Sequence, residues 1–164
     1  MVYIQTNYVI VKPIYRNGVI IMRISAKGRY GIAALASMAK LEGVDKIVTL
    51  ISLSERLNIS KIYLEQVFNL LKRGGIVTAV KGARGGYYLA KQPKDISIYN
   101  ILSAIETTIF EKTEPTIQKG DDDLERAINE NVFDVLDNSI KTTLSNISLE
   151  DIVNKSSESY MYYL

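Results

Sequence analysis

Residues 49–89 read TLISLSERLNISKIYLEQVFNLLKRGGIVTAVKGARGGYYL. Their order of signals predicts a short helix, a tight turn, a longer helix and a glycine-rich basic hairpin. This order is typical of a winged helix-turn-helix, in which one helix enters the DNA major groove and a basic loop lies against the backbone or the minor groove. The stretch therefore predicts a DNA-binding regulator rather than an enzyme.

Two helices are expected inside this stretch, each with a capping residue before it. Thr49 caps the first, about residues 50–57, and Ser60 caps the second, about residues 61–73. The second helix has an apolar face of Leu64, Val67, Phe68 and Leu71, and an outward face of Lys61, Ile62, Glu65, Gln66, Asn69 and Lys72. An exposed polar face of this kind is what a recognition helix presents to bases.

The segment after the second helix predicts a β-hairpin with a basic turn. Strands are expected at residues 76–80 and 87–89, joined by KGARGG at residues 81–86. Glycine-rich loops also cradle nucleotide phosphates, but the sequence has no GxxxxGKS/T or GxGxxG, and this loop leads into a strand. The turn is therefore interpreted as a wing that carries Lys81 and Arg84.

The outward residues have chemistries that suit particular parts of DNA. The hydroxyls of Ser60 and Tyr63 are suited to phosphates, which fix the position of the helix. Gln66 suits a bidentate pair with adenine, and Glu65 suits the amino group of cytosine. The two wing cations suit a narrow minor groove or phosphates.

The composition excludes several other kinds of site. None of the 164 residues is Cys or His. Disulfides, thiolate chemistry, Cys/His zinc sites and the usual general base are therefore excluded, and we expect no catalytic residue, metal or cofactor. No nucleophile–base pair is visible, so an enzyme is not expected. No run of 18 apolar residues is present, so no membrane span or membrane partner is predicted.

Charge is distributed unevenly behind a net value of +2. Residues 22–92 hold 12 Lys and Arg against 4 Asp and Glu, whereas residues 93–164 hold 6 against 14. The first segment thus carries +8 and the second −8, and residues 1–21 add +2. A basic half suits a polyanion and an acidic half does not, which favours double-stranded DNA as the partner of the first half.

The chain divides into an N-terminal extension (1–21), a winged helix-turn-helix domain (22–106), a polar loop (107–120), and a dimerisation helix with a C-terminal tail (121–164). The extension is expected to form a short hairpin or strand, and a signal peptide is not expected. The predicted fold class is mainly α with a small β-hairpin wing.

The domain is expected to begin with a helix that Ser25 caps and that runs to about Glu42. Its buried stripe is expected at Ile32, Leu35, Ala36 and Ala39. Lys27 and Arg29 fall in its first turn, where the helix dipole disfavours cations. A nearby DNA phosphate would resolve this conflict; two solvated side chains are the alternative. A further helix is expected at residues 97–106.

A longer helix is expected from Asp121 to Leu144. Its apolar stripe consists of Leu124, Ile128, Val132, Val135, Leu136, Ile140 and Leu144. Such a stripe packs on its own domain or pairs with a second copy, and both partners stay open at this point. Ser148 and Asp151 predict a capping box for a short final helix.

MRISAKGRYG from residue 22 and YLEQVFNLLKRGGIVTAVKGARGGYYLA from residue 63 resemble the Rrf-two family of bacterial winged-helix regulators. The resemblance covers about residues 22–164. It implies cytoplasmic transcription control by a homodimer, with the long helix at 121–144 as the dimer element. The family's recognition-helix and wing positions fall on Ser60, Tyr63, Glu65, Gln66 and Lys81. The wing position is often Arg, and Lys81 lacks the planar fork of Arg.

Many members of this family hold an iron–sulfur cluster through three Cys in the loop before the long helix. That loop, residues 107–120, has none here, so cluster sensing is excluded on ligand chemistry. Among cluster-free members, the chain is most similar to the CymR-type repressors of cysteine metabolism, through VFDVLDNSI, ISLEDI and the terminal YMYYL. This similarity implies a partner, cysteine synthase (O-acetylserine sulfhydrylase), which modulates repression in response to O-acetylserine.

The tail offers one hypothesis for that partnership. The carboxylate of Leu164, with Tyr162 and Tyr163, would dock in the active-site cleft of the synthase. The alternative is that residues 160–164 pack on the chain's own dimer. Two other functions remain open: a regulator of another pathway that senses a small molecule directly, and an interaction module that has lost DNA binding.

Overall fold

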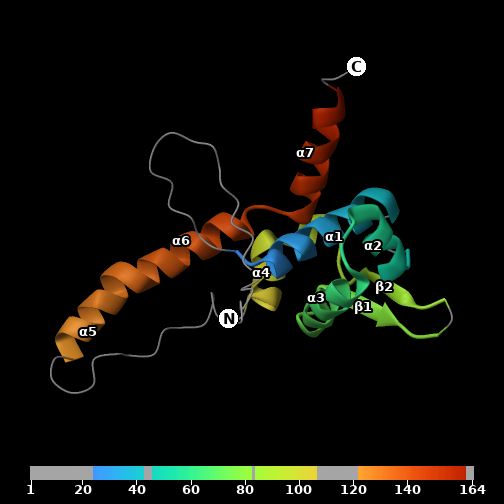
Figure 1. Ribbon diagram of the computed structural model, residues 1–164. Helices are drawn as coiled ribbons and strands as arrows, with labels where there is room; N and C mark the ends of the chain where they lie inside the picture. Colours follow the sequence, from blue (N-terminus) through green and yellow to red (C-terminus); the bar gives the residue numbers. More distant parts are fainter. Residues whose placement is uncertain (1–23, 43–45, 83, 107–121, 162–164) are drawn as a thin grey trace, which may run out of the picture.

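The computed structural model describes residues 24–42, 46–82, 84–106 and 122–161. Its elements are α1 (Ala26–Glu42), α2 (Leu50–Leu57), α3 (Lys61–Arg73), β1 (Val77–Val80), β2 (Gly86–Leu89), η1 (Pro93–Asp95), α4 (Ile98–Ile105), α5 (Asp122–Ile128), η3 (Asn129–Phe133), α6 (Asp134–Ser145) and α7 (Leu149–Met161). Helices α1 to α4 and the hairpin gather in one body, from which α5 and α6 project (Figure 1). This order confirms the predicted winged-helix fold class. No helix in the described ranges is long and apolar enough to cross a membrane.

The core forms around α1, which packs against α2, α3, α4 and α7. Its centre consists of Leu35, Met38, Leu53, Leu64, Phe68, Ile101, Leu102 and Leu149, all almost fully buried. The stripe predicted for α1 was only partly right. Leu35 is buried as expected, but Ala34 and Met38 are the other fully enclosed positions, and the predicted Ile32, Ala36 and Ala39 are only partly buried. Helices that cover α1 from several sides widen and turn the buried band, which a single-stripe pattern does not encode.

Short-range hydrogen bonds fix where most helices begin. The side chain of Thr49 accepts from the backbone of Ser52 at 3.1 Å, as its capping role predicts. Ser148 and Asp151 form the expected capping box at the start of α7. Ser60 precedes α3 but makes no side-chain capping hydrogen bond, so that prediction was wrong. Its backbone is not in the geometry that aims the hydroxyl at the helix, and the side chain is exposed.

The wing is a two-stranded antiparallel hairpin, paired from Val77↔Leu89 to Val80↔Gly86. Each strand is displaced by one residue from the predicted start. Val48 adds a single bridge to the outer strand, with two backbone hydrogen bonds to Tyr87 of 2.8 and 2.9 Å. A Cβ at Gly86 would lie 2.5 Å from the Val48 carbonyl oxygen, so this close approach requires glycine. The bridge ties the base of the wing to the segment before α2.

The predicted long helix is present but is not uniform. It runs from Asp122 to Ser145 with a π-helical turn, η3, in the middle. Its α6 end packs on α4, and Ile140 and Leu144 are half-buried there. Farther out, five large apolar side chains remain exposed: Leu124, Val132, Phe133, Val135 and Leu136. The alternative of packing on its own domain therefore holds only for the inner end.

The C-terminal helix is fastened to the core at its first residue. Two backbone hydrogen bonds of 2.8 Å, from Ile98 to Ile147 and from Leu149 to Ile96, join the segments before α4 and before α7. Leu149 itself is fully buried. Helix α7 then continues for 13 residues, longer than the short helix predicted, because its first turns pack on α1 and η1. The predicted features of residues 1–21, of the loop 107–120 and of the last three residues lie outside the described residues.

Candidate DNA-binding surface

Helix α3 has two faces, as the sequence pattern predicted. Leu64, Val67, Phe68 and Leu71 are fully buried against the domain. The opposite face exposes Gln66 and Asn69, and Ile62 is 70% exposed. An isoleucine this open on an otherwise polar face is unusual within the described residues and offers a methyl-binding surface beside Gln66, one turn away.

Glu65 shares this outer face and forms an ion pair with Lys61 at 3.2 Å. Both side chains are about half exposed, at 45% and 52%. An ion pair this open to water contributes at most about 1 kcal/mol, so Glu65 can exchange Lys61 for a base amino group at little cost. The pair also keeps the Glu65 carboxylate oriented along the helix surface.

The turn before α3 creates a cavity against α1. Asn58 is in the left-handed conformation, with φ of 52°, and the Ser54 hydroxyl donates to the carbonyl of Ile59 at 2.7 Å. A cavity of about 440 Å³ lies between this turn and the first part of α1, lined by Arg29 and Tyr30 among others. The exposed Arg29 therefore faces the start of the recognition helix. Lys27, on the same first turn of α1, is half-buried.

Tyr63 is half-buried beneath this region rather than open on the surface. Its ring meets that of Tyr30 edge to face, with centroids 5.3 Å apart. Burial first, and then Tyr30 and Glu106, raise the pKa of the Tyr63 phenol above its ordinary value of 10.0. The group therefore stays a hydroxyl donor throughout the physiological range.

The start of α1 holds a residue that the sequence did not single out. Glu106 follows α4 and is buried, and its carboxylate accepts hydrogen bonds from the Ser25 amide at 3.0 Å and from the Ser25 hydroxyl at 2.5 Å. The carboxylate thus occupies the positive end of the α1 dipole. This contact supplies from within the chain part of the negative charge that a DNA phosphate was expected to supply to Lys27 and Arg29.

The glycine of the KGRYG motif explains why Glu106 reaches this position. A Cβ at Gly28 would lie 2.6 Å from a carboxylate oxygen of Glu106 and 2.7 Å from a methyl group of Ile24. A larger residue would therefore push α4 away from the start of α1. The only sequence signal for the contact was this glycine, because Ser25 and Glu106 are 81 positions apart.

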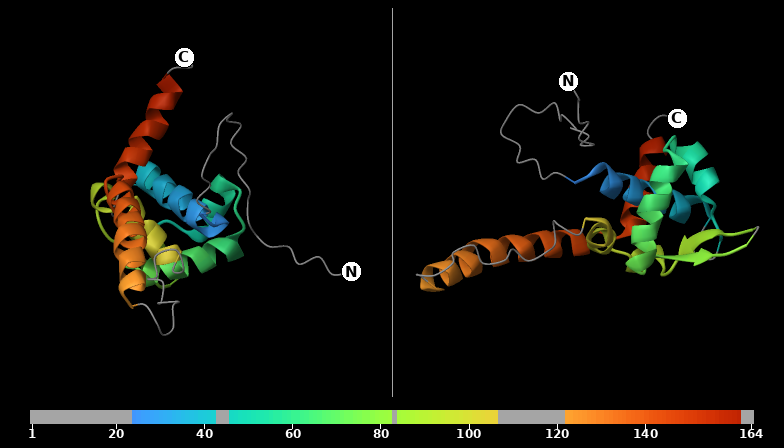
Figure 2. Two further views of the ribbon diagram at one scale, coloured as in Figure 1. Left: turned by 90° about the vertical axis from the view of Figure 1, so that its left-hand side faces the viewer. Right: turned by 60° about the horizontal axis from the view of Figure 1, so that its bottom comes forward.

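The wing carries its two cations at the exposed turn. Lys81 and Arg84 are both exposed, and the hairpin points away from the helices (Figure 2). Because β1 packs on α3 and α3 on α1, the predicted contact residues of α1, α3 and the wing lie on adjoining elements. They are Lys27, Arg29, Ser60, Tyr63, Glu65, Gln66, Lys81 and Arg84.

Comparisons with known proteins agree with this geometry. Residues 24–155 match the family model Rrf2, described as an iron-dependent transcriptional regulator. The HTH-type transcriptional regulator IscR of Pectobacterium carotovorum subsp. carotovorum is 34% identical over 133 residues, which cover 81% of this chain and 80% of the relative. The same regulator of Photorhabdus laumondii is 35% identical over equal shares.

Two solved structures have similar folds. CymR, the global cysteine regulator of B. subtilis, superposes with a TM-score of 0.63 at 27% identity, over 82% of this chain and 98% of CymR. IscR of T. potens superposes with a TM-score of 0.62 at 31% identity, over 87% of this chain and 97% of the other.

The iron in the family description has no fitting ligand set here. Iron–sulfur clusters are held by Cys thiolates, with His as the usual replacement, and the whole sequence contains neither residue. Within the described ranges, no three acidic side chains gather around a point that could hold a metal ion. The relatives are transcriptional regulators and not enzymes. With the winged-helix geometry and the match over residues 24–155, the chain belongs to the Rrf2 family of transcriptional regulators.

Proposed function

We propose that this protein is a sequence-specific DNA-binding repressor that acts as a homodimer. The observation that carries this proposal is the exposed face of α3 beside a wing with two exposed cations. A helix with such a face fits the major groove, while a basic hairpin next to it reaches the neighbouring backbone or minor groove. The net charge of +8 over residues 22–92 supports binding to a polyanion.

Base recognition is assigned to the outer face of α3. Gln66 pairs bidentately with adenine, and Glu65 accepts from the amino group of cytosine after leaving Lys61. Ile62 packs against a thymine methyl group, a role that its 70% exposure favours and that its residue type alone did not suggest.

Phosphate contacts are assigned to the residues around α3. Ser60 is exposed and its hydroxyl is not used as a helix cap, so it is available to a phosphate. Arg29 borders the cavity beside the turn, and Lys27 lies on the same turn of α1. Tyr63 is half-buried, so its contribution is to hold Tyr30 and the helix start in place as well as to donate its hydroxyl.

Dimerisation is assigned to the outer part of α5 and α6. Leu124, Val132, Val135 and Leu136 of the predicted stripe are exposed there, Ile128 is half-buried and Phe133 joins them. A large apolar surface on a projecting helix suits burial against a second copy. Pairing along this helix would present two recognition helices to a two-fold operator, about one DNA turn (~34 Å) apart.

The pathway proposed is cysteine and sulfur metabolism. The similarity in fold to CymR, the motifs VFDVLDNSI and ISLEDI, and the absence of cluster ligands support this choice. The proposed partner is cysteine synthase, bound through Tyr162, Tyr163 and Leu164, which lie just beyond the end of α7. Deletion of the last four residues is expected to abolish synthase binding and leave DNA binding intact. Synthase binding that survives the deletion would contradict the docking role.

The experiment that tests DNA binding is fluorescence anisotropy on genomic fragments across a salt series, with and without cysteine synthase. We expect tight, sequence-selective binding that weakens steeply with salt and changes with the synthase. Selective binding that is indifferent to the synthase would keep the repressor and remove the partner. Absence of selective binding at low salt would leave only an interaction module.

A second candidate is a regulator of another pathway that senses a small molecule directly. The observation in its favour is a polar cavity at the junction of α3, the wing and α4, which is separate from the recognition face. Its contents decide between the two candidates.

A further inference from the structure

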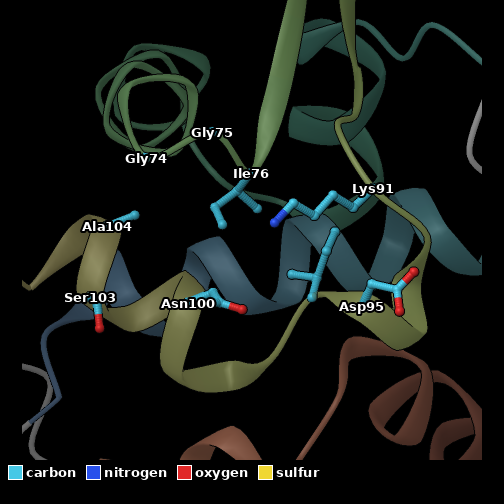
Figure 3. A pocket seen from close by; sticks show the side chains of 9 residues that line it. Gly74, Gly75, Ile76, Lys91, Asp95, Asn100, Ser103 and Ala104 are labelled. Atoms are coloured by element: carbon cyan, nitrogen blue, oxygen red, sulfur yellow. The ribbon is translucent and has the colours of Figure 1, made fainter.

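The cavity lies where the recognition helix passes into the wing. It has a volume of about 290 Å³ and is enclosed by three parts of the fold. Gly74 and Gly75 close it from the end of α3, Lys91 enters from the segment after β2, and Asn100 enters from α4 (Figure 3). The volume is at the lower end of the range for ligand pockets, about 300–1,000 Å³, and suits a small metabolite.

Two hydrogen-bond donors form one pole of the cavity. Lys91 lies along the cavity in Figure 3, and within the described residues no acidic side chain forms an ion pair with it. The side-chain oxygen of Asn100 is already held by the amide and hydroxyl of Ser97, at 3.1 and 2.8 Å. The remaining amide nitrogen of Asn100 is therefore the group free to bind, and it only donates. An ammonium beside an amide donor selects a carboxylate.

The opposite pole is negative. Asp95 of η1 also lines the cavity, and its carboxylate is turned away from the Lys91 ammonium (Figure 3). The end of α3 at Gly74 adds the partial negative charge of a helix C-terminus. A molecule that satisfies both poles carries an ammonium group and a carboxylate within a small volume. We propose that this cavity is an effector site for a small, amino-acid-like zwitterion.

The position of the cavity gives such a ligand access to DNA binding. Ile76, which lines the cavity, donates to Leu71 of α3 at 2.9 Å and accepts from Ala90, after β2, at 3.0 Å. An occupant therefore touches the joint that sets the angle between recognition helix and wing. A ligand that binds one angle more tightly than another shifts the population toward it and changes operator affinity. This regulatory part rests on the proposed DNA binding.

The test is isothermal titration calorimetry of the full chain with each of the standard L-amino acids. We expect at least one to bind, and expect matched compounds that lack the amine or the carboxylate to bind about tenfold more weakly or worse. Lys91→Ala and Asp95→Asn should each weaken binding about tenfold. Lys94→Ala is the matched control, because Lys94 is an exposed neighbour in η1 that does not line the cavity.

The outcomes separate this inference from the proposed function. No binding by wild type at about 10 mM of any amino acid, or binding that Lys91→Ala and Asp95→Asn leave unchanged, overturns the site. Operator affinity is then measured by anisotropy with and without the bound amino acid. A change of several-fold in wild type and in Lys94→Ala, absent in Lys91→Ala, supports regulation, and no change overturns it. Ligand binding by a protein that binds no DNA would instead contradict the proposed function and leave the site in place.

Discussion

At the scale of single residues, the contact between Ser25 and Glu106 shapes the DNA-facing end of α1. It places a buried carboxylate at the start of a helix whose first turn carries Lys27 and Arg29. The carboxylate offsets the dipole and the two cations without help from DNA. It also joins the end of α4 to the surface proposed to bind phosphates.

Replacing Glu106 with Gln tests this contact. The variant keeps the shape of the side chain but loses the charge, so the free energy of unfolding should fall by about 1–2 kcal/mol. Urea denaturation measures the difference. Glu55→Gln is the control, because Glu55 is exposed on α2 and its loss should change stability by no more than about 0.5 kcal/mol. Equal stability of both variants would remove the structural role of Glu106.

Gln66 and Lys81 are expected to differ in what their loss does to DNA binding. Gln66→Ala should weaken binding to the preferred operator by about 1–3 kcal/mol and relax selection at one base pair, because it removes a base contact. Lys81→Ala should weaken binding to all duplexes alike and lower the salt slope by about one, because it removes a phosphate contact. Binding-site selection and salt titration measure the two effects. Unchanged base preference in Gln66→Ala would contradict its assignment.

How far the sequence predicts this surface depends on sequence distance. The residues of α3 and the wing lie within one continuous stretch, where helical period and turn chemistry sort inward from outward positions. Glu106 lies outside that stretch, and its contact depends on how α4 packs on α1, which local patterns do not encode. Tyr63 shows the same limit, because its burial against Tyr30 comes from helix packing.

At the scale of elements, helix α7 depends on its capping box. Hydrogen bonds from the Ser148 hydroxyl and amide lower the pKa of Asp151 below its ordinary value of 3.8. A carboxylate with a lowered pKa in the folded protein stabilises it above the unfolded value, and this contribution is lost as the pH falls through the folded value.

Asp151→Asn should therefore melt at a lower temperature than wild type near neutral pH. The gap should begin to close as the pH falls below about 3.8 and should vanish below the lowered pKa. Thermal melts followed by circular dichroism across the acid range measure the gap. Glu55→Gln should follow wild type throughout. A gap that stays constant with pH would show that the ionised carboxylate does not stabilise the cap.

The elements that the sequence predicted are those with local signals. Capping residues, glycine turns and alternating apolar positions marked α2, α3, α4 and the hairpin to within about two residues. The π turn in the long helix has no such signal, since one extra residue in a turn leaves the apolar pattern nearly intact. The uncapped Ser60 depended on backbone geometry that residue type alone does not fix.

At the scale of the whole molecule, the exposed apolar surface of α5 and α6 should control assembly. Leu136→Glu places a charge on a side chain that is half exposed in the single chain, so the fold of each protomer should persist. Dimerisation should weaken by about tenfold or more, and operator affinity should fall with it, because the charge would be buried between copies. Sedimentation velocity and anisotropy measure the two effects.

Thr142→Glu is the matched control for that variant. Thr142 is exposed on the same helix but lies nearer the body of the protein and outside the apolar cluster. This variant should sediment as wild type does. If both variants dimerise equally well, another surface joins the copies.

The fastening of the segments before α4 and α7 has a mechanical consequence. A helix from Asp122 to Ser145 is about 36 Å long at 1.5 Å per residue, and it is held only at its inner end. It acts as a lever with its pivot at α4: a turn of about 10° there moves the far tip by about 6 Å over that length. If two such levers are joined in a dimer, a turn of a few degrees at each pivot shifts one DNA-reading head against the other by a large part of a groove width.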